Sequence, residues 1–166
     1  MEIKYFNSNF DKITQNKDTD QSITNVIEKL PSLNIISDKN LLEETIKISN
    51  QFKEKKEKII VFGTGGSNLG ARALNNIISN NKIILEFYDN VDPINFEKNF
   101  QNINFELTGF LVISKSGTTP ETLSQFSCLY QKAIEANKVE DFFSNTLIIT
   151  EFKESPLFKI AKDNNC

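Results

Sequence analysis

The chain has 166 residues, of which 39% are hydrophobic and 25% charged, and it carries a net charge of −3 at pH 7. This length suits one domain with a sizeable core, and the composition excludes a wholly disordered or fibrous chain. The slightly acidic balance argues against nucleic acid and against an anionic membrane as partners. No apolar run approaches the roughly 20 residues that a membrane-spanning helix needs.

The sequence contains no histidine and only two cysteines, Cys128 and Cys166. Histidine has the ordinary pKa that best suits acid–base work near neutrality, so any catalysis must use other groups or residues outside this chain. Because histidine and cysteine are the usual ligands of zinc, their scarcity also argues against a zinc site, and we expect neither a metal nor a cofactor. Two cysteines make no disulfide framework, and the N-terminus lacks the features of a signal peptide. The expected location is therefore the cytoplasm.

The chain is predicted to consist of a helical N-terminal extension, residues 1–57, and an α/β domain, residues 58–166. In the extension, Asp20 is expected to cap a short helix that Pro31 ends. Asp38 precedes a longer helical pattern whose apolar residues recur at i, i+3 and i+4.

From residue 58 onwards, short continuous apolar runs alternate with helical patterns. Continuous runs of β-branched residues are typical of strands covered on both faces, as in parallel sheets. Strands that alternate with helices imply right-handed βαβ units, so we predict a three-layer, doubly wound parallel sheet of four or five strands. The predicted strands are residues 59–62, 83–88, 110–113 and 146–150. Helical stripes are predicted at Leu69, Ala73, Leu74 and Ile77, after Asp92-Pro93, and at Leu123, Phe126, Tyr130, Ala133 and Ile134.

The first loop with binding chemistry follows the first predicted strand and runs from Gly63 to Gly70 (GTGGSNLG). Its glycines allow a tight turn and close approach of a ligand to the backbone, and a helix start there favours an anion such as phosphate. It is not a P-loop, because no Gly-Lys-Ser/Thr follows. The dinucleotide fingerprint fits poorly because Asn68 occupies its third glycine position. A plain turn with Ser67 as helix N-cap is the alternative.

The second loop follows the third predicted strand and runs from Ser114 to Thr122 (SKSGTTPET). Pro120 at a first helical position makes Thr119 the N-cap; alternatively, Thr118 is the cap and Glu121 closes a capping box. Hydroxyls and N–H groups at a helix start can bind phosphate, although a Ser/Thr-rich turn with a cap would look the same. Both loops follow strands of one sheet, so they can lie side by side at its carboxyl edge.

The two loops together resemble those of the glucose-6-phosphate isomerase family and, more broadly, the sugar isomerase (SIS) domain. The resemblance covers about residues 58–162 and includes Thr150-Glu151 and Ser155-Pro156-Leu157. It implies that the loops hold the phosphate of a sugar phosphate. The positions implied to bind that phosphate are Gly66, Ser67, Ser114, Lys115 (mainly through its backbone), Ser116, Thr118 and Thr119.

The family interconverts an aldose phosphate and a ketose phosphate through an enediol, with glutamate, histidine, lysine and arginine as active groups. Their motifs belong to the later part of the subunit, so no catalytic residue is assigned here. The resemblance implies the N-terminal part of an isomerase that converts glucose 6-phosphate to fructose 6-phosphate in glycolysis and gluconeogenesis. This chain alone is expected to be inactive. A homodimer is implied for the full-length protein, whereas the oligomeric state of this chain is left open.

Two other functions are alternatives to an isomerase fragment. A stand-alone SIS module would bind a sugar phosphate for sensing or regulation without chemistry. A nucleotide-binding α/β domain is disfavoured because position 68 is not glycine, although Asp89 could supply the acidic residue that ends its second strand. Cys128 is predicted to be a small buried thiol on the helix after the second loop.

Overall fold

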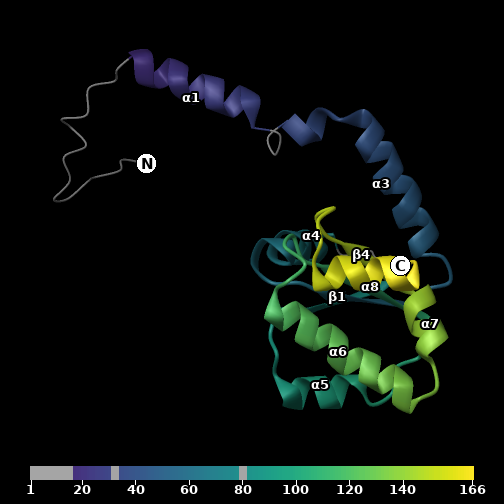
Figure 1. Cartoon of the computed structure of the whole chain (residues 1–166). Helices are drawn as coiled ribbons and strands as arrows, with labels where there is room; N and C mark the ends of the chain where they lie inside the picture. The colour runs from purple at the N-terminus through teal and green to yellow at the C-terminus, as the bar shows by residue number, and fades with distance from the viewer. Residues whose placement is uncertain (1–16, 31–33, 79–81) are drawn as a thin grey trace. The chain divides into compact units, whose positions relative to one another are not determined.

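The structure, a computed structural model, describes residues 17–30, 34–78 and 82–166. It divides the chain into two compact units, Met1–Lys47 and Ile48–Cys166, which are described separately (Figure 1). The functional boundary between residues 57 and 58 stays a prediction. The predicted end of the first helix at Pro31 lies outside the described residues.

The first unit is helical, as the sequence predicts. Its first helix, α1, comprises Lys17–Lys29, so the predicted cap at Asp20 is wrong. Asp20 is instead the fourth residue of α1. The apolar side chains of α1 and of the residue after it are 41% to 57% exposed: Ile23, Val26, Ile27 and Leu30.

A short 3-10 helix, η2 (Ile35–Ser37), precedes the long helix α3 (Lys39–Phe52). The helical pattern predicted after Asp38 is confirmed, and Asp38 caps this helix, because the backbone N–H of Leu41 donates to its Oδ1 at 3.0 Å. The last residues of α3 belong to the second unit, where Phe52 lies against β3 at Gly109.

The second unit contains a parallel sheet of four strands in the order β2-β1-β3-β4, which confirms the predicted α/β class. Because β1 pairs with β2 on one side and with β3 on the other, the direction of winding reverses between β1 and β3. Ligands of open α/β sheets bind at this switch point, beyond the carboxyl ends of the strands. The strands are β1 (Lys58–Phe62), β2 (Ile84–Tyr88), β3 (Thr108–Ile113) and β4 (Thr146–Ile149).

Helices lie on both sides of this sheet: Figure 1 shows α5 and α6 on one side and α4 on the other. The predicted start at Asp92-Pro93 is confirmed, since Asp92 Oδ1 accepts the N–H of Ile94 at 3.0 Å. The helices are η3 (Gly65–Ser67), α4 (Leu69–Ile77), α5 (Pro93–Phe100), α6 (Pro120–Glu135), α7 (Val139–Ser144) and α8 (Pro156–Asn164). No helix in the described part of the chain has the length and apolar character needed to cross a bilayer.

A core rich in phenylalanine fixes the positions of β1 and β3. Phe62 on β1 and Phe110 on β3 are fully buried. Phe62 stacks on Phe96 of α5 with ring centroids 6.1 Å apart, and Phe110 lies 5.2 Å from the ring of Phe142. Such aromatic pairs add to the free energy gained by burial alone. The ends of β1 and β3, where the two predicted loops begin, are thereby anchored.

Cys128 on α6 is exposed, so the prediction of a buried thiol is wrong. The helix turns Phe126, Leu129 and Ala133 towards the core, and Cys128 lies on another side of the same helix. Spacing on a helix decides which residues share a face, whereas only the packing decides which face is buried.

Candidate phosphate-binding site

The loops after β1 and β3 meet at the switch point of the sheet, as predicted. A Cβ built on Gly63 would lie 3.1 Å from the carbonyl oxygen of Ser67 and 3.3 Å from that of Ile113. Gly63 therefore lies between its own loop and the end of β3, where a larger residue would force one of them to move. The close approach of the two loops depends on this glycine.

The first loop is closed by Asn68, which is fully buried. Its Nδ2 donates to the carbonyl oxygen of Gly63 at 3.0 Å, across the whole turn. Asn68 is also the N-cap residue of α4, so the alternative in which Ser67 caps that helix is wrong. Within the described residues, the exposed N–H groups of Gly65 and Gly66 donate to no protein acceptor. These N–H groups, and the half-buried Ser67, are open to a ligand.

The second loop begins with a buried pair of hydroxyls. Ser114 is 2% exposed, and its Oγ lies 2.9 Å from Thr119 Oγ1 and accepts the N–H of Gly117 at 3.1 Å. Thr119 is the N-cap residue of α6, ahead of Pro120, so of the two predicted caps the structure contains this one. The Thr119 hydroxyl is directed to Ser114 instead of to the helix. The buried position of Ser114 suits it to orient Thr119.

Ser116 and Thr118 form the exposed rim of the second loop. The N–H and Oγ1 of Thr118 both donate to Ser116 Oγ, at 3.2 Å and 3.0 Å. Because Ser116 Oγ accepts these two hydrogen bonds, its own hydrogen is available to an anion. The side chain of Lys115 is 86% exposed and its Nζ lies 3.8 Å from Glu151 Oε1.

The segment between β4 and α8 packs against the second loop. Gly117 has φ +65°, and a Cβ there would overlap the hydroxyl of Ser155. The Gly117 carbonyl accepts the N–H of Leu157 at 3.2 Å, and the Lys115 carbonyl accepts that of Glu151 at 3.1 Å. These contacts hold the loop against the start of α8, which Ser155 caps by accepting the N–H of Phe158.

The assembled site suits an anion. Two helix starts, exposed backbone N–H groups and several hydroxyls converge where β1 and β3 end, and this combination binds phosphate without a bulky cation. No cluster of metal-ligating side chains occurs in residues 17–30, 34–78 and 82–166. Because the two loops lie together, the seven predicted positions lie at the same edge of the sheet. They are Gly66 and Ser67 in the first loop and Ser114, Lys115, Ser116, Thr118 and Thr119 in the second. Their binding of phosphate stays a prediction.

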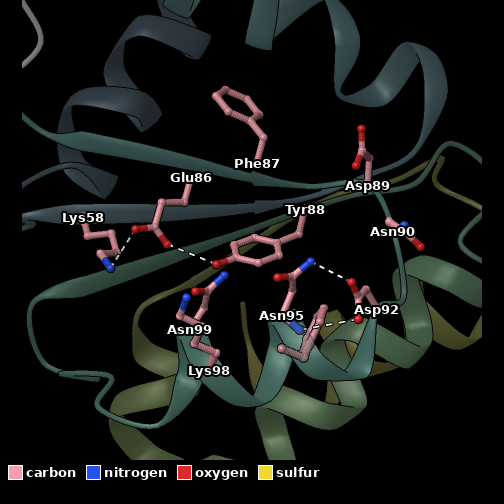
Figure 2. A pocket seen from close by; sticks show the side chains of 11 residues that line it. Lys58, Glu86, Phe87, Tyr88, Asp89, Asn90, Asp92, Asn95, Lys98 and Asn99 are labelled. Atoms are coloured by element: carbon pink, nitrogen blue, oxygen red, sulfur yellow. Dashed lines mark hydrogen bonds and ion pairs between the residues drawn. The ribbon is translucent and has the colours of Figure 1, made fainter.

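A separate groove of 660 Å³ runs between β2 and α5 (Figure 2). Its charges are largely engaged with one another: Lys58 Nζ lies 2.8 Å from Glu86 Oε1, and the Tyr88 hydroxyl donates to Glu86 Oε2 at 3.3 Å. Asp92, at the end of the groove, caps α5. The lining contains three carboxylates, those of Glu86, Asp89 and Asp92, against two lysines, so a phosphate is better accommodated at the two loops.

Burial, and then the neighbouring Glu86 carboxylate, raise the pKa of Tyr88 to about 12. The neutral phenol is therefore favoured in the folded state, and its contribution to stability is lost as the pH rises from about 10 towards 12. We expect Tyr88 to ionise well above pH 10, as measured by phenolate absorbance. Glu86→Gln should lower its pKa only in part, because burial persists. Ionisation of Tyr88 near pH 10, with Tyr88→Phe identifying its signal, would contradict this expectation.

The fold and the loops define an α/β domain with a pair of anion-compatible loops at the switch point of a doubly wound sheet. The phosphoglucose isomerase family model matches residues 14–164. The glucose-6-phosphate isomerases of Prochlorococcus marinus subsp. pastoris and Borreliella burgdorferi (strain ZS7) are 35% and 34% identical over 123 and 126 residues. Each alignment covers 72% of this chain and 23% of the relative.

Solved structures show the same similarity. A glucose-6-phosphate isomerase from Chlamydia trachomatis has a TM-score of 0.60 at 25% identity, covering 69% of this chain and 23% of that one. A protein of Thermus thermophilus described as hypothetical has a TM-score of 0.66 at 27% identity, covering 74% and 30%. The chain belongs to the phosphoglucose isomerase family, and it spans about a quarter of the length of the curated relatives it matches.

The sequence did not reveal two structural roles at this site. In the sequence Asn68 is only a misfit to a dinucleotide fingerprint, whereas in the structure its amide closes the first loop. Ser155 belonged to a stretch that resembles the family, but its packing against Gly117 depends on tertiary structure. A polar residue within a glycine-rich turn is a signal for the first role, and no local signal exists for the second.

Proposed function

We propose that this chain supplies the phosphate-binding part of an isomerase site that interconverts glucose 6-phosphate and fructose 6-phosphate. The observation that supports this is the pair of hydroxyl- and glycine-rich loops at the switch point, in a chain of the phosphoglucose isomerase family. Both sugars carry the same phosphate group, so one set of contacts serves substrate and product. The loops would anchor the phosphate while the sugar extends beyond the strand ends.

Each predicted residue then has a distinct task. The N–H groups of Gly66 and Lys115, together with that of the neighbouring Gly65, donate to phosphate oxygens, and the hydroxyls of Ser67, Ser116 and Thr119 complete the set. Thr118 orients Ser116, because its own hydroxyl donates to Ser116 Oγ at 3.0 Å. Ser114 acts as a positioning residue, because its buried hydroxyl holds Thr119 Oγ1 at 2.9 Å. Hydrogen bonds to a charged acceptor are stronger than those between neutral groups.

The proton transfer between C1 and C2 of the sugar needs a base within about 3 Å of the reacting carbons. We assign that base, and the groups that open the sugar ring, to the part of an isomerase that this chain does not match. The second candidate is a stand-alone sugar-phosphate-binding module, which would need only the two loops that this chain contains. A protein that binds glucose 6-phosphate but never gains activity when the rest of an isomerase is supplied would be such a module.

Removal of single hydroxyls tests the proposed contacts. Ser116→Ala and Thr119→Ala should each weaken binding of glucose 6-phosphate by about 10-fold to 150-fold, since a hydrogen bond to a charged group contributes roughly 1.5–3 kcal/mol. Titration followed by amide NMR shifts measures the affinity and locates the site. Ser124→Ala, a hydroxyl on α6 outside the two loops, is the matched control and should bind normally. Equal affinities for all variants, or shifts away from residues 63–70 and 114–122, would rule out this site.

A further inference from the structure

The two loops, residues 63–70 and 114–122, contain one cationic residue, Lys115, and one acidic residue, Glu121. Lysine carries its charge on a flexible four-carbon stem, so the ammonium can move while the backbone of the loop stays fixed. Among the described residues, the charged partner of Lys115 is Glu151, whose Oε1 lies 3.8 Å from Lys115 Nζ. The charge that a phosphate meets at this site therefore depends on a residue outside both loops.

The backbone holds Glu151 beside Lys115. Strands β3 and β4 are parallel, with Ile113 paired to Ile149. The pairing continues past the strand ends, because the N–H of Ser114 donates to the Ile149 carbonyl at 3.0 Å. One residue further along each segment, the N–H of Glu151 donates to the Lys115 carbonyl at 3.1 Å. The carboxylate is therefore fixed at the same edge of the sheet as the phosphate loops.

Glu151 is close enough to act on a bound phosphate. The proposed phosphate position lies between the ends of β1 and β3, and β4 is the next strand beyond β3. Because neighbouring strands lie about 4.8 Å apart, the residues that follow β4 are about 7 Å from this position. Charges are screened over about 8 Å at physiological ionic strength, so a carboxylate at that distance still repels a phosphate.

The carboxylate of Glu151 therefore offsets the ammonium of Lys115. The ammonium attracts a phosphate, the carboxylate repels it, and the two charges are of equal size. Both side chains are exposed, and exposed ion pairs contribute little to the stability of a fold. The effect of this pair falls on the ligand instead.

We infer that Glu151 is an affinity-determining residue of the phosphate site, which weakens the binding of a sugar phosphate by neutralising Lys115. The inference rests on the proposed function, because it concerns the ligand of the same two loops. It assigns to β4 a part in phosphate binding that neither loop contains. The hydroxyls and N–H groups of the loops then supply the affinity, without help from a net positive charge.

Weak binding of the phosphate suits an isomerase. The substrate and the product carry the same phosphate, so contacts with that group bind both equally. Such uniform binding lowers KM without raising kcat, and a tighter hold on the phosphate would slow release of the product. A residue that limits the affinity therefore favours turnover.

Charge substitutions in the whole chain test the inference without relying on activity. The variants are Glu151→Gln, Lys115→Met and the two combined. Glu135→Gln is the matched control, since it removes the same charge from another exposed ion pair, with Lys132 at 3.3 Å. Glu135 ends α6, about 20 Å from the loop that precedes the helix. Binding of glucose 6-phosphate is measured by titration with amide NMR shifts, at about 10 mM and about 1 M salt, where charges are screened over about 30 Å and 3 Å.

We expect Glu151→Gln to bind glucose 6-phosphate about 3-fold to 10-fold more tightly than the parent at low salt, because a phosphate monoester carries about −1.5 to −2 charge. This gain should disappear at high salt. Lys115→Met should weaken binding at low salt by a similar factor, and the combined variant should bind like the parent. Glu135→Gln should match the parent at both salt concentrations.

Parent-like binding by Glu151→Gln at low salt overturns the inference. A gain that persists at high salt also overturns it, because the new amide would then act by a direct contact. Weaker binding by Glu151→Gln would show that the carboxylate contacts the sugar, which is the opposite role. In each of these cases shifts at residues 63–70 and 114–122 leave the proposed function intact. If the parent itself gives no shifts at these loops, the proposed function and the inference both fail.

Discussion

Purified alone, residues 1–166 are expected to convert no glucose 6-phosphate to fructose 6-phosphate above the uncatalysed rate. Proton transfer between C1 and C2 needs a base at hydrogen-bond distance, and the sequence offers no histidine to assist ring opening. Glu121, within the second loop, and Glu151, beside Lys115 in the structure, are both exposed, and Glu121 lies in the first turn of α6. With the phosphate held at the loops, both carboxylates would lie near the phosphate end of the substrate and away from C1.

The expected loss of isomerase activity is large because several catalytic contributions are missing from this chain together. General acid–base catalysis typically contributes about 10²-fold to 10⁴-fold, and loss of the groups that stabilise the enediolate costs about 10²-fold to 10³-fold more. A coupled assay that detects fructose 6-phosphate measures the result, with a full-length isomerase of the family as positive control. Activity that persists through repurification and disappears in Ser116→Ala would show that this chain contains its own base.

The second large effect is expected at Gly117. Gly117→Ala should lower the free energy of unfolding by about 2–5 kcal/mol, because a left-handed backbone costs about 1–2 kcal/mol for other residues and forced packing about 1–3 kcal/mol. Gly117 has φ +65°, and the added Cβ would overlap the Ser155 hydroxyl at the start of α8. Binding of glucose 6-phosphate should weaken as well, since the displaced loop carries Ser116 and Thr119.

Denaturant unfolding measures the stability, and Gly70→Ala is the matched control. A Cβ at Gly70, in the first turn of α4, meets nothing within 4 Å, so that variant should be as stable as the parent or slightly more stable. Adding Ser155→Gly to Gly117→Ala should remove most of the steric part of the loss, since only the Thr150 hydroxyl, 3.0 Å from the added Cβ, then remains close, while the backbone part persists. Equal stability of Gly117→Ala and Gly70→Ala would mean that neither strain nor overlap operates at Gly117.

Much of the fold was predictable because its signals are local. Continuous apolar runs marked β1 to β4 to within two residues, since parallel strands are buried on both faces and show no alternation. Asp38 and Asp92 indicated helix starts. The carboxylate of each accepts a free backbone N–H two or three residues later, so the cap can be recognised from the local sequence. The same reasoning gave the wrong start at Asp20, because α1 already begins at Lys17 and the residue type alone does not fix the first residue of a helix.

The two loops, and with them the family, were also evident from residue order. Glycines and hydroxyls that follow a strand and precede a helix indicate an anion site wherever the fold places the carboxyl ends of the strands together. The structure places them together by pairing β1 with β3, an arrangement that the strand count alone leaves open.

The sequence by itself therefore determined the strands, the two loops and the family resemblance, all of which depend on neighbouring residues. Only the tertiary structure decided which side chains are buried: Ser114 inside its loop, Asn68 across the first turn, Cys128 in solvent, and α4 with its apolar side chains uncovered. The physical reason is that periodicity defines the faces of an element, whereas burial depends on which other segments reach each face. For α4, no described segment of the second unit buries its apolar side chains.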